Sequence, residues 1–428
     1  MSASAGILFD ASQAGTPRAG CGELAYGLGC ALAKTRDDII FADTFGSHVW
    51  TETPFSSSCD QEFNVVAKFA KHSEAKQFWD RPFALVERSL GYPEVVHANN
   101  FYCPVGGRAP VVYTIHDTVV FDTPEYTDER NRAYCAHQMV RASLYADYFV
   151  ANSSATKDAF LKHFDVDPRR IQVVPLGSKF GWSKQISEKA EDGPPYFLFV
   201  GTLEPRKNLD GVLRGFAAAK LSGVVAKLKI VGRLGWMTSA LDPIIEALGL
   251  SQDVEVLGYV PDDRLADLMG GARALVLASH AEGFGMPAVE ALSVGVPVIA
   301  SDIAALKEVC GPLAFYCDPS SELSISNAFC QAANLSGDSR SDLAQECRRR
   351  AANFTWREAA ILVGSVYDRA IQSDPSGVRR GLRVVKGDVL PALRSRAVRR
   401  KFWERLRSDR SSALTKYWER LSVIWGGK

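Results

Sequence analysis

Residues 282–290 read Glu-Gly-Phe-Gly-Met-Pro-Ala-Val-Glu, so that two carboxylates flank a glycine-rich turn. The apolar run at 274–279 before this turn has the composition of a short buried strand. Gly283 and Gly285 carry no side chain, which lets a ligand approach the backbone of the turn closely. The stretch therefore predicts a strand, a binding turn and a helix in succession.

The helix after the turn is predicted from its two ends. Pro287 fits the first helical position, and Gly295 is the type of residue that ends a helix in a left-handed conformation. Glu290 then lies one turn inside the helix, where free N–H groups and the positive dipole end favour an anion. Alternatively, Glu282 and Glu290 are ordinary solvated residues of a turn and a helix start.

This stretch resembles the E-x7-E signature of the retaining GT-B glycosyltransferases of family 4, and the resemblance runs from about Gly6 to about Asp368. The resemblance implies that Glu290 hydrogen-bonds the ribose of a nucleotide and that Glu282 hydrogen-bonds a hydroxyl of the donor sugar. Phe284, with the two glycines beside it, would line the same donor site.

Length and composition limit the class of protein. A chain of 428 residues with 46% hydrophobic residues can form two domains with large cores. Charge is balanced, with 50 Lys and Arg against 49 Asp and Glu, so global charge indicates no particular partner. Nine scattered cysteines without a CxxC pair predict reduced thiols in a cytoplasmic protein. We expect neither a signal peptide nor a membrane span.

The order of elements predicts an α/β fold. A strand at 7–9, a loop with Gly15, Gly20 and Gly22, and a helix at 24–32 have the order of a dinucleotide-type unit. Further strands separated by helical stretches predict parallel sheets. In the first half these strands are expected at 95–97, 111–115, 148–151 and 171–175, and in the second half at 196–200, 227–231, 254–257, 274–277 and 297–300.

The resemblance implies a GT-B architecture, in which two Rossmann-like domains face each other across a cleft. Ligands of open α/β sheets bind at the carboxyl ends of the strands, and such a cleft is built from those ends. The expected parts are an N-terminal acceptor domain at 1–182, a linker at 183–195, a donor domain at 196–353, a helix crossing back to the first domain at 354–374, and a basic amphipathic tail at 375–428.

A second motif, Gly-Thr-Leu-Glu-Pro-Arg-Lys-Asn at 201–208, directly follows the first strand of the second domain. Arg206 and Lys207 can neutralise a diphosphate, and Gly201 allows close backbone approach. The alternative is an exposed basic loop. Family 4 members carry this Gly-x-x-x-x-Arg-Lys-Asn pattern with the Arg and Lys on the donor diphosphate.

Three further positions complete the predicted donor site. Gly232 and Arg233 follow the next strand, and the glycine would open the same side of the cleft. Tyr259 lies in a segment that resembles the one through which family members contact the nucleotide base. The residue types do not reveal which base is bound.

The candidate site residues of the first domain are histidines. His116 follows the strand at 111–115, and the family carries a histidine here that faces the sugar and the reaction centre; a structural histidine is the alternative. His97 is interpreted as structural or acceptor-side, and His280 as a solvated loop residue. The loop from Gly15 to Gly22 departs from the Gly-Ile-Gly-Arg-Tyr form of close relatives.

The predicted reaction uses His116, Glu282, Arg206 and Lys207 as its catalytic residues. A nucleotide diphosphate is a good leaving group, so the protein has only to stabilise the developing charge. Arg206 and Lys207 can supply that stabilisation without a metal, and the sequence has no DxD cluster placed to hold a divalent ion. We therefore expect no metal and no cofactor beyond the donor substrate.

The tail carries fifteen Lys and Arg and four Asp and Glu over residues 379–428, a net charge of +11. Leu414, Trp418, Leu421 and Trp425 recur at helical spacing, which is typical of a basic amphipathic helix on an anionic membrane surface. Alternatively, the stripe packs on the catalytic domains. RNA binding is a third interpretation, and nucleic acid is not the expected partner.

Together these features predict a retaining, metal-independent hexosyltransferase of family 4. GDP-mannose is the favoured donor because residues 199–208 and 231–236 resemble mannosyltransferase-type members, and UDP-linked hexoses are the alternative. The acceptor would be a glycan or a lipid-linked glycan of polysaccharide biosynthesis, and the location cytoplasmic or on the inner face of the membrane. The alternatives are a nucleotide-sugar epimerase of the same fold and a non-catalytic binding or scaffold protein. A glycoside hydrolase would not need Arg206 and Lys207 for a diphosphate.

Overall fold

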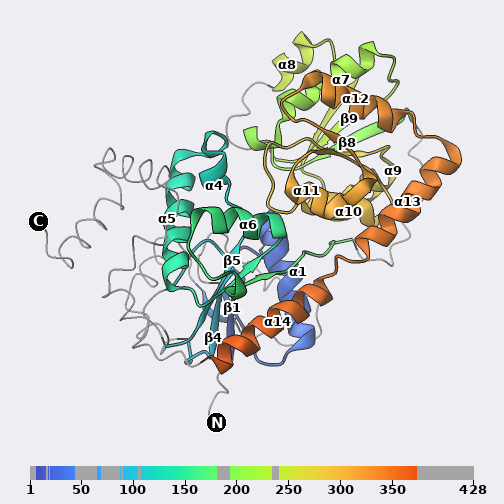
Figure 1. Cartoon of the computed structure of the whole chain (residues 1–428). Helices are drawn as coiled ribbons and strands as arrows, with labels where there is room; N and C mark the ends of the chain where they lie inside the picture. The colour runs from blue at the N-terminus through green and yellow to red at the C-terminus, as the bar shows by residue number, and fades with distance from the viewer. Residues whose placement is uncertain are drawn as a thin grey trace, which may run out of the picture.

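The computed structural model describes residues 6–15, 18, 20–43, 65–68, 87, 90–104, 108–180, 193–233 and 241–373. The predicted tail at 375–428, most of the linker at 183–195 and part of the loop between Gly15 and Gly22 lie outside the described residues. Figure 1 shows two lobes, the first running from blue to green and the second from yellow-green to orange. A long helix in orange-red returns from the second lobe to the first.

The first lobe is built on a seven-stranded parallel sheet of order β3-β2-β1-β4-β5-β6-β7. Its strands are β1 (Ile7–Asp10), β2 (Ile39–Asp43), β3 (Val65–Lys68), β4 (Val95–Ala98), β5 (Val111–Ile115), β6 (Tyr148–Ala151) and β7 (Ile171–Val173). Its helices are α1 (Gly20–Thr35), α4 (Val119–Asp122), α5 (Glu129–Tyr145) and α6 (Ser154–His163), with short 3-10 turns at Pro124–Tyr126 and Pro168–Arg170.

The second lobe is built on a six-stranded parallel sheet of order β10-β9-β8-β11-β12-β13. Its strands are β8 (Tyr196–Val200), β9 (Lys227–Val231), β10 (Val254–Gly258), β11 (Leu275–Leu277), β12 (Val298–Ser301) and β13 (Ala314–Cys317). Its helices are α7 (Leu209–Leu221), α8 (Leu241–Ala247), α9 (Asp262–Gly271), α10 (Met286–Ser293), α11 (Ala304–Cys310), α12 (Glu322–Ala333) and α13 (Gly337–Ala351), with 3-10 turns at Pro205–Lys207 and Gly311–Leu313.

The central strands are buried on both faces, as their near-continuous apolar sequences require. Every residue of β5 and of β8 is buried. Helices cover the two faces of each sheet, so the predicted α/β fold with two Rossmann-like domains is confirmed.

The last helix, α14 (Trp356–Gln372), packs against α1 and against strands of the first sheet. Thr355 caps its start by accepting a hydrogen bond from the backbone N–H of Glu358 at 3.1 Å, in the Thr-x-x-Glu arrangement of a capping box. Buried side chains of α14, among them Tyr367, join an apolar cluster that includes β1, α1, β8 and α10. One continuous core therefore connects the two lobes.

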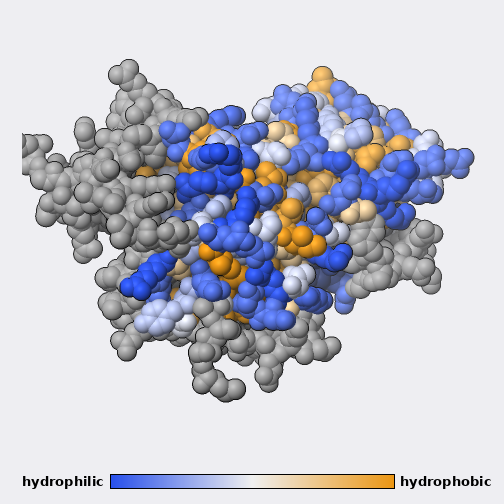
Figure 2. Space-filling model, turned by 60° about the horizontal axis from the view of Figure 1, so that its bottom comes forward, coloured by the Kyte–Doolittle hydropathy of each residue, from blue (hydrophilic) through white to orange (hydrophobic). Residues whose placement is uncertain are grey.

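The structure corrects several details. Strands β2, β3 and β13 were not predicted, and α10 begins at Met286, one residue before Pro287. The predicted left-handed residue at the end of this helix is confirmed, since Gly295 has a φ of 82°. No helix in the described ranges is both long and apolar enough to cross a bilayer. Figure 2 shows a largely hydrophilic face with apolar side chains gathered near its centre.

The contact between α1 and α14 depends on a glycine. A Cβ on Gly27 would lie 2.3 Å from the indole of Trp356, whereas a Cβ on Gly364, within α14 itself, would have its nearest neighbour at 3.7 Å. Both glycines are helical, so Ala at either position gains about 0.5–1 kcal/mol of helix preference. We expect Gly364→Ala to keep or raise the unfolding midpoint, and Gly27→Ala to lose about 1–3 kcal/mol through overpacking.

Denaturant unfolding of the two variants measures this difference directly. Equal stability of Gly27→Ala and Gly364→Ala would contradict the described packing of Trp356 on α1.

Candidate active site

A cavity of about 330 Å³ lies between the two lobes, where the carboxyl ends of both sheets meet. All of the residues proposed from the sequence line this one cavity, although they come from turns far apart in the chain. They are His116, Gly201, Arg206, Lys207, Gly232, Arg233, Tyr259, Glu282, Gly283, Phe284, Gly285 and Glu290.

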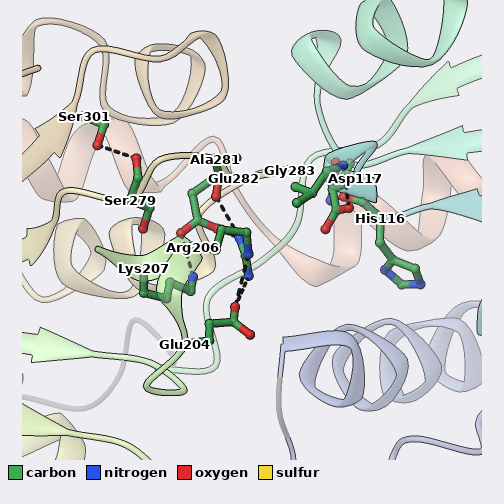
Figure 3. A network of polar contacts seen from close by, with 12 residues as sticks. His116, Asp117, Glu204, Arg206, Lys207, Ser279, Ala281, Glu282, Gly283 and Ser301 are labelled. Atoms are coloured by element: carbon green, nitrogen blue, oxygen red, sulfur yellow. Dashed lines mark hydrogen bonds and ion pairs between the residues drawn. The ribbon is translucent and has the colours of Figure 1, made fainter. Parts of the chain in front are cut away.

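An ion-pair cluster forms one wall of the cavity. Lys207 Nζ lies 2.6 Å from Glu282 Oε1, and Arg206 Nη1 lies 3.1 Å from Glu282 Oε2. Arg206 also pairs with Glu204 at 2.7 Å and donates to the carbonyl of Ala281 at 2.8 Å. Figure 3 shows both cationic side chains directed at Glu282. The alternative of an exposed basic loop is wrong, because the side chains of Arg206 and Lys207 are only 18% and 11% exposed.

The cluster fixes the charge of Glu282. Burial by itself would raise the pKa of this carboxyl, but Lys207 and Arg206 beside it outweigh burial and hold the pKa at about 2. The interpretation of Glu282 as a solvated turn residue is therefore wrong. At neutral pH its carboxylate is an anion that accepts hydrogen bonds and does not donate a proton.

Backbone geometry explains the neighbouring residues of both motifs. Asn208 adopts a left-handed conformation with φ 57° and donates to the carbonyls of Ala278 and Pro319, which holds the basic loop against the turn after β11. A Cβ on Gly232 would lie 1.8 Å from the carbonyl oxygen of Gly201. Glycine is therefore required where the turns after β8 and β9 meet.

Glu290 reaches the cavity from the first turns of α10. The residue is 5% exposed, and within the described part of the chain its carboxyl makes no side-chain hydrogen bond. Burial raises its pKa to about 7; Lys179 opposes the rise, while Glu23 and Asp262 add to it. The interpretation as a surface residue is wrong, and the two glutamates of the motif have opposite electrostatic surroundings.

The turn that contains Gly283 also contacts the first lobe. Ser153 and Thr156 donate to the carbonyl oxygen of Gly283 at 2.6 and 2.9 Å. Glu308 of α11 accepts from the backbone N–H groups of Ser154 and Ala155 at 2.9 and 3.2 Å, and so caps α6 across the interface. We call Ser153, Thr156 and Glu308 the interlobe clamp.

His116 lies on the first-lobe side of the cavity. Its Nε2 is 2.7 Å from the carbonyl oxygen of Asn99, and the side chain of Asn152 donates to its backbone carbonyl at 2.7 Å. A Cβ on Gly283 would lie 2.0 Å from that same carbonyl, so the turn between the two glutamates touches His116 directly. Figure 3 shows the imidazole of His116 turned away from Glu282 and Arg206.

The other two histidines considered from the sequence, His97 and His280, have structural partners. His97 is fully buried between Tyr367 and Thr114, at 2.6 and 2.8 Å, and burial lowers its pKa to about 3, so it is neutral at physiological pH. Its place in the core agrees with the structural interpretation. His280 was expected to be solvated, but its ring stacks on Tyr126 of the first lobe with centroids 4.5 Å apart.

The remaining predicted residues that line the cavity differ in their exposure. Tyr259 is 55% exposed, and the guanidinium of Arg233 lies 5.0 Å from the centre of its ring. Phe284 is buried and packs edge-on against Phe354. No group of three or more His, Cys, Asp or Glu in the described ranges is arranged to hold a metal ion.

Several residues of the site were not predicted. Glu204 and Lys179 line the cavity and the interlobe clamp adjoins it; Glu204 lies within the motif at 201–208, and Ser153 lies just after a predicted strand. Ser153 is the second residue after β6 and therefore lies at the same sheet edge as His116.

Comparison with known proteins identifies two consecutive matches. Residues 32–178 match the model of "Glycosyltransferase Family 4", and residues 182–352 match "Glycosyl transferases group 1". The chain is 29% identical over 286 residues to O-antigen chain mannosyltransferase B of Escherichia coli, which covers 64% of this chain and 74% of that protein. It is 36% identical over 244 residues to the serotype-specific mannosyltransferase WbdA of the same species, covering 53% of this chain but only 30% of WbdA.

A solved structure shares the fold. HepE from Anabaena, crystallised with UDP and glucose, superimposes with a TM-score of 0.65 at 20% identity, over 85% of this chain and 99% of HepE.

The two glutamates predict opposite effects on stability. Folding raises the pKa of Glu290, so the folded protein loses stability as pH rises from about 4.5 to about 7. Folding lowers the pKa of Glu282, so its ionised carboxylate stabilises the folded protein above about pH 4.5. At pH 8 we expect Glu290→Gln to be more stable than the parent by roughly 3 kcal/mol, and Glu282→Gln to be less stable by a similar amount.

Unfolding curves of both variants at pH 4.5 and pH 8 provide the measurement, because the Glu290→Gln advantage should largely disappear at the lower pH. If both substitutions changed the free energy of unfolding in the same direction at pH 8, the opposite electrostatic surroundings described for Glu282 and Glu290 would be contradicted.

The interlobe clamp predicts a local effect of Glu308→Ala. Loss of this cap, about 1 kcal/mol, should increase hydrogen exchange at the N–H groups of Ser154 and Ala155 and raise the radius of gyration in solution scattering. Asp128→Ala is the matched control, since Asp128 caps α5 within one lobe. Faster exchange in Glu308→Ala with unchanged dimensions, as in the control, would show that Glu308 does not hold the lobes together.

Proposed function

We propose that this chain, which belongs to the GT-B glycosyltransferases of family 4 and group 1, transfers mannose from a nucleotide diphosphate to a glycan or lipid-linked acceptor, with retention of the anomeric configuration. The observation that carries the proposal is the single cavity in which paired Arg206 and Lys207 lie beside an ionised Glu282, with Glu290 on the next helix.

The donor diphosphate is assigned to Arg206 and Lys207. Both cations have carboxylate partners within the protein, so the cluster is electrically balanced by itself. A bound diphosphate would share these cations with Glu282 and Glu204, and the negative charge that develops on the leaving phosphate would strengthen those contacts in the transition state. The step needs no metal, because the two side chains supply the positive charge.

The sugar and the ribose are assigned to the two glutamates. Glu282 is a permanent anion fixed by its ion pairs, so it suits hydrogen bonds from sugar hydroxyls and positions the ring for attack. Glu290 has a carboxyl that faces the cavity and is open to ribose hydroxyls. His116 faces the cavity from the other lobe, which is where the acceptor would approach.

Mannose is the preferred sugar because both mannosyltransferase relatives are named for it. GDP is proposed as the nucleotide because residues 199–208 and 231–236 resemble mannosyltransferase-type members. HepE, which shares the fold, was crystallised with UDP and glucose, so a UDP-hexose is the competing donor.

The basic tail at 379–428 is proposed to hold the enzyme at an anionic membrane surface, where a lipid-linked acceptor would be found. The support is its sequence alone, with a net charge of +11 and tryptophans at helical spacing.

The donor assignment is tested with purified full-length protein in EDTA, by binding and by slow release of nucleotide from GDP-mannose, GDP-glucose, UDP-glucose and UDP-galactose. We expect selective binding of GDP-mannose. Glu290→Ala should weaken donor binding about tenfold or more, since it would lose hydrogen bonds to two ribose hydroxyls that contribute about 0.5–1.5 kcal/mol each. Glu246→Ala, on an exposed part of α8, is the matched control and should bind as the parent does.

Failure to bind any nucleotide sugar would contradict a transferase. Conversion of the donor to an isomeric nucleotide sugar without an acceptor would indicate an epimerase.

A further inference from the structure

A pair of aromatic rings joins the two lobes next to the ion-pair cluster. Tyr126, in the 3-10 turn Pro124–Tyr126 of the first lobe, lies parallel to the ring of His280 in the second lobe, with an interplanar angle of 3° and ring centroids 4.5 Å apart. Both side chains are half-buried, and neither belongs to the described residues that line the cavity. The stack is therefore a contact between the lobes and lies outside the proposed substrate site.

The second-lobe side of the stack is tied to the basic loop. The backbone N–H of His280 donates to the carbonyl of Arg206 at 2.9 Å. The guanidinium of Arg206 in turn donates to the carbonyl of Ala281 at 2.8 Å. Glu282 follows in the same turn and pairs with Arg206 at 3.1 Å. A displacement of His280 would therefore be transmitted to both Arg206 and Glu282.

The first-lobe side of the stack is also held by hydrogen bonds. The backbone N–H of Tyr126 donates to the carbonyl of Thr123 at 3.1 Å. The carbonyl of Pro124 accepts from the hydroxyl of Thr127 and from the guanidinium of Arg132 on α5, both at 2.8 Å. These bonds fix the 3-10 turn on α5, so the ring of Tyr126 has a defined place from which it can hold a second-lobe residue.

The turn at 280–283 is attached to the first lobe at both ends. His280 at its start stacks on Tyr126, and Gly283 at its end accepts hydrogen bonds from the interlobe clamp. Glu282 lies between these two attachments, whereas its ion-pair partners Arg206 and Lys207 belong to the second lobe. The attachments therefore determine where the ion-pair cluster lies relative to the first lobe, and not how the cluster itself is built.

The stack depends on two uncharged rings. Burial lowers the pKa of His280, although Asp318 and Glu125 act in the opposite direction, so the imidazole is neutral at pH 7.5. Neutral aromatic rings attract each other through their packed faces, and this attraction does not need the hydroxyl of Tyr126. Phenylalanine at position 126 therefore keeps the contact, whereas alanine removes it.

We propose that Tyr126 is a positioning residue for the transfer, because its stack on His280 holds the ion-pair cluster in place relative to His116. The proposal rests on the proposed function. Donor binding is assigned to second-lobe side chains, so it should not need the stack. Turnover requires groups of both lobes in register, and a small misplacement of such groups slows a reaction strongly. A contact that only stabilised the fold would not separate binding from turnover.

Turnover is tested with full-length protein in EDTA at pH 7.5, as nucleotide release from whichever of the four nucleotide sugars the parent hydrolyses fastest. Tyr126→Ala and His280→Ala should each lower this rate about tenfold and leave the Kd of the corresponding nucleoside diphosphate within about twofold of the parent value. Tyr126→Phe should keep the parent rate. Tyr92→Ala, which removes an exposed tyrosine of the first lobe, is the matched control and should also keep it.

Three results of this experiment would overturn the proposal. They are an unchanged rate in Tyr126→Ala, an equal loss of rate in Tyr126→Phe, and a loss of nucleotide binding as large as the loss of rate.

A double variant with Tyr126→Ala and His280→Ala shows whether the two residues act through one contact. Its rate should then be about tenfold below that of the parent, as in either single variant, because the second substitution has no further contact to remove. Losses that multiply to about a hundredfold would show independent effects and would overturn the role of the stack.

Hydrogen exchange tests the attachment without any activity. Tyr126→Ala should speed exchange at the backbone N–H of His280, which donates to Arg206, and Tyr126→Phe should exchange as the parent does. Exchange in Tyr126→Ala as slow as in the parent would overturn the positioning role. A parent protein that hydrolyses no nucleotide sugar would contradict the proposed function, and exchange would still decide whether Tyr126 holds the turn.

Discussion

The ion pairs of Glu282 with Lys207 and Arg206 are the interaction on which the rest of the site depends. A carboxylate with a side chain only 6% exposed would be protonated without nearby cations, and unpaired cations at this depth would be equally unfavourable. The pairs join the turn after β8 to the turn after β11. Once that turn is fixed, its Gly283 meets the first lobe and α10 begins where Glu290 reaches the cavity.

Two glutamates eight positions apart thus acquire different properties from their surroundings. Glu282 is held as an anion by cations, whereas Glu290 is brought close to neutrality by burial and by the acidic side chains near it. Divergent environments of this kind are typical of sites in which paired carboxyl groups have separate roles. Among the described residues no side chain hydrogen-bonds the buried carboxyl of Glu290, and this cost to the fold is consistent with the ligand-binding role proposed for position 290.

Apolar runs were sufficient to predict the central strands, because strands such as β5 and β8 are buried on both faces. Strand β13 was missed although its four residues, Ala-Phe-Tyr-Cys, are all apolar, because periodicity alone does not distinguish so short an apolar run from part of a helix. Every residue that the sequence motifs and strand ends proposed for donor binding lines the cavity between the lobes. Contacts between lobes, such as the stacking of His280 on Tyr126 or the cap that Glu308 provides to α6, join residues more than a hundred positions apart and leave no local pattern.

The most direct test of the central claim is a crystal structure of the full-length protein with bound GDP. The account predicts the diphosphate within hydrogen-bond distance of Arg206 and Lys207, with both cations still near Glu282, and the ribose hydroxyls on the carboxyl of Glu290. A nucleotide bound elsewhere, or one in this cavity whose ribose points away from Glu290, would contradict the assignment of the two glutamates.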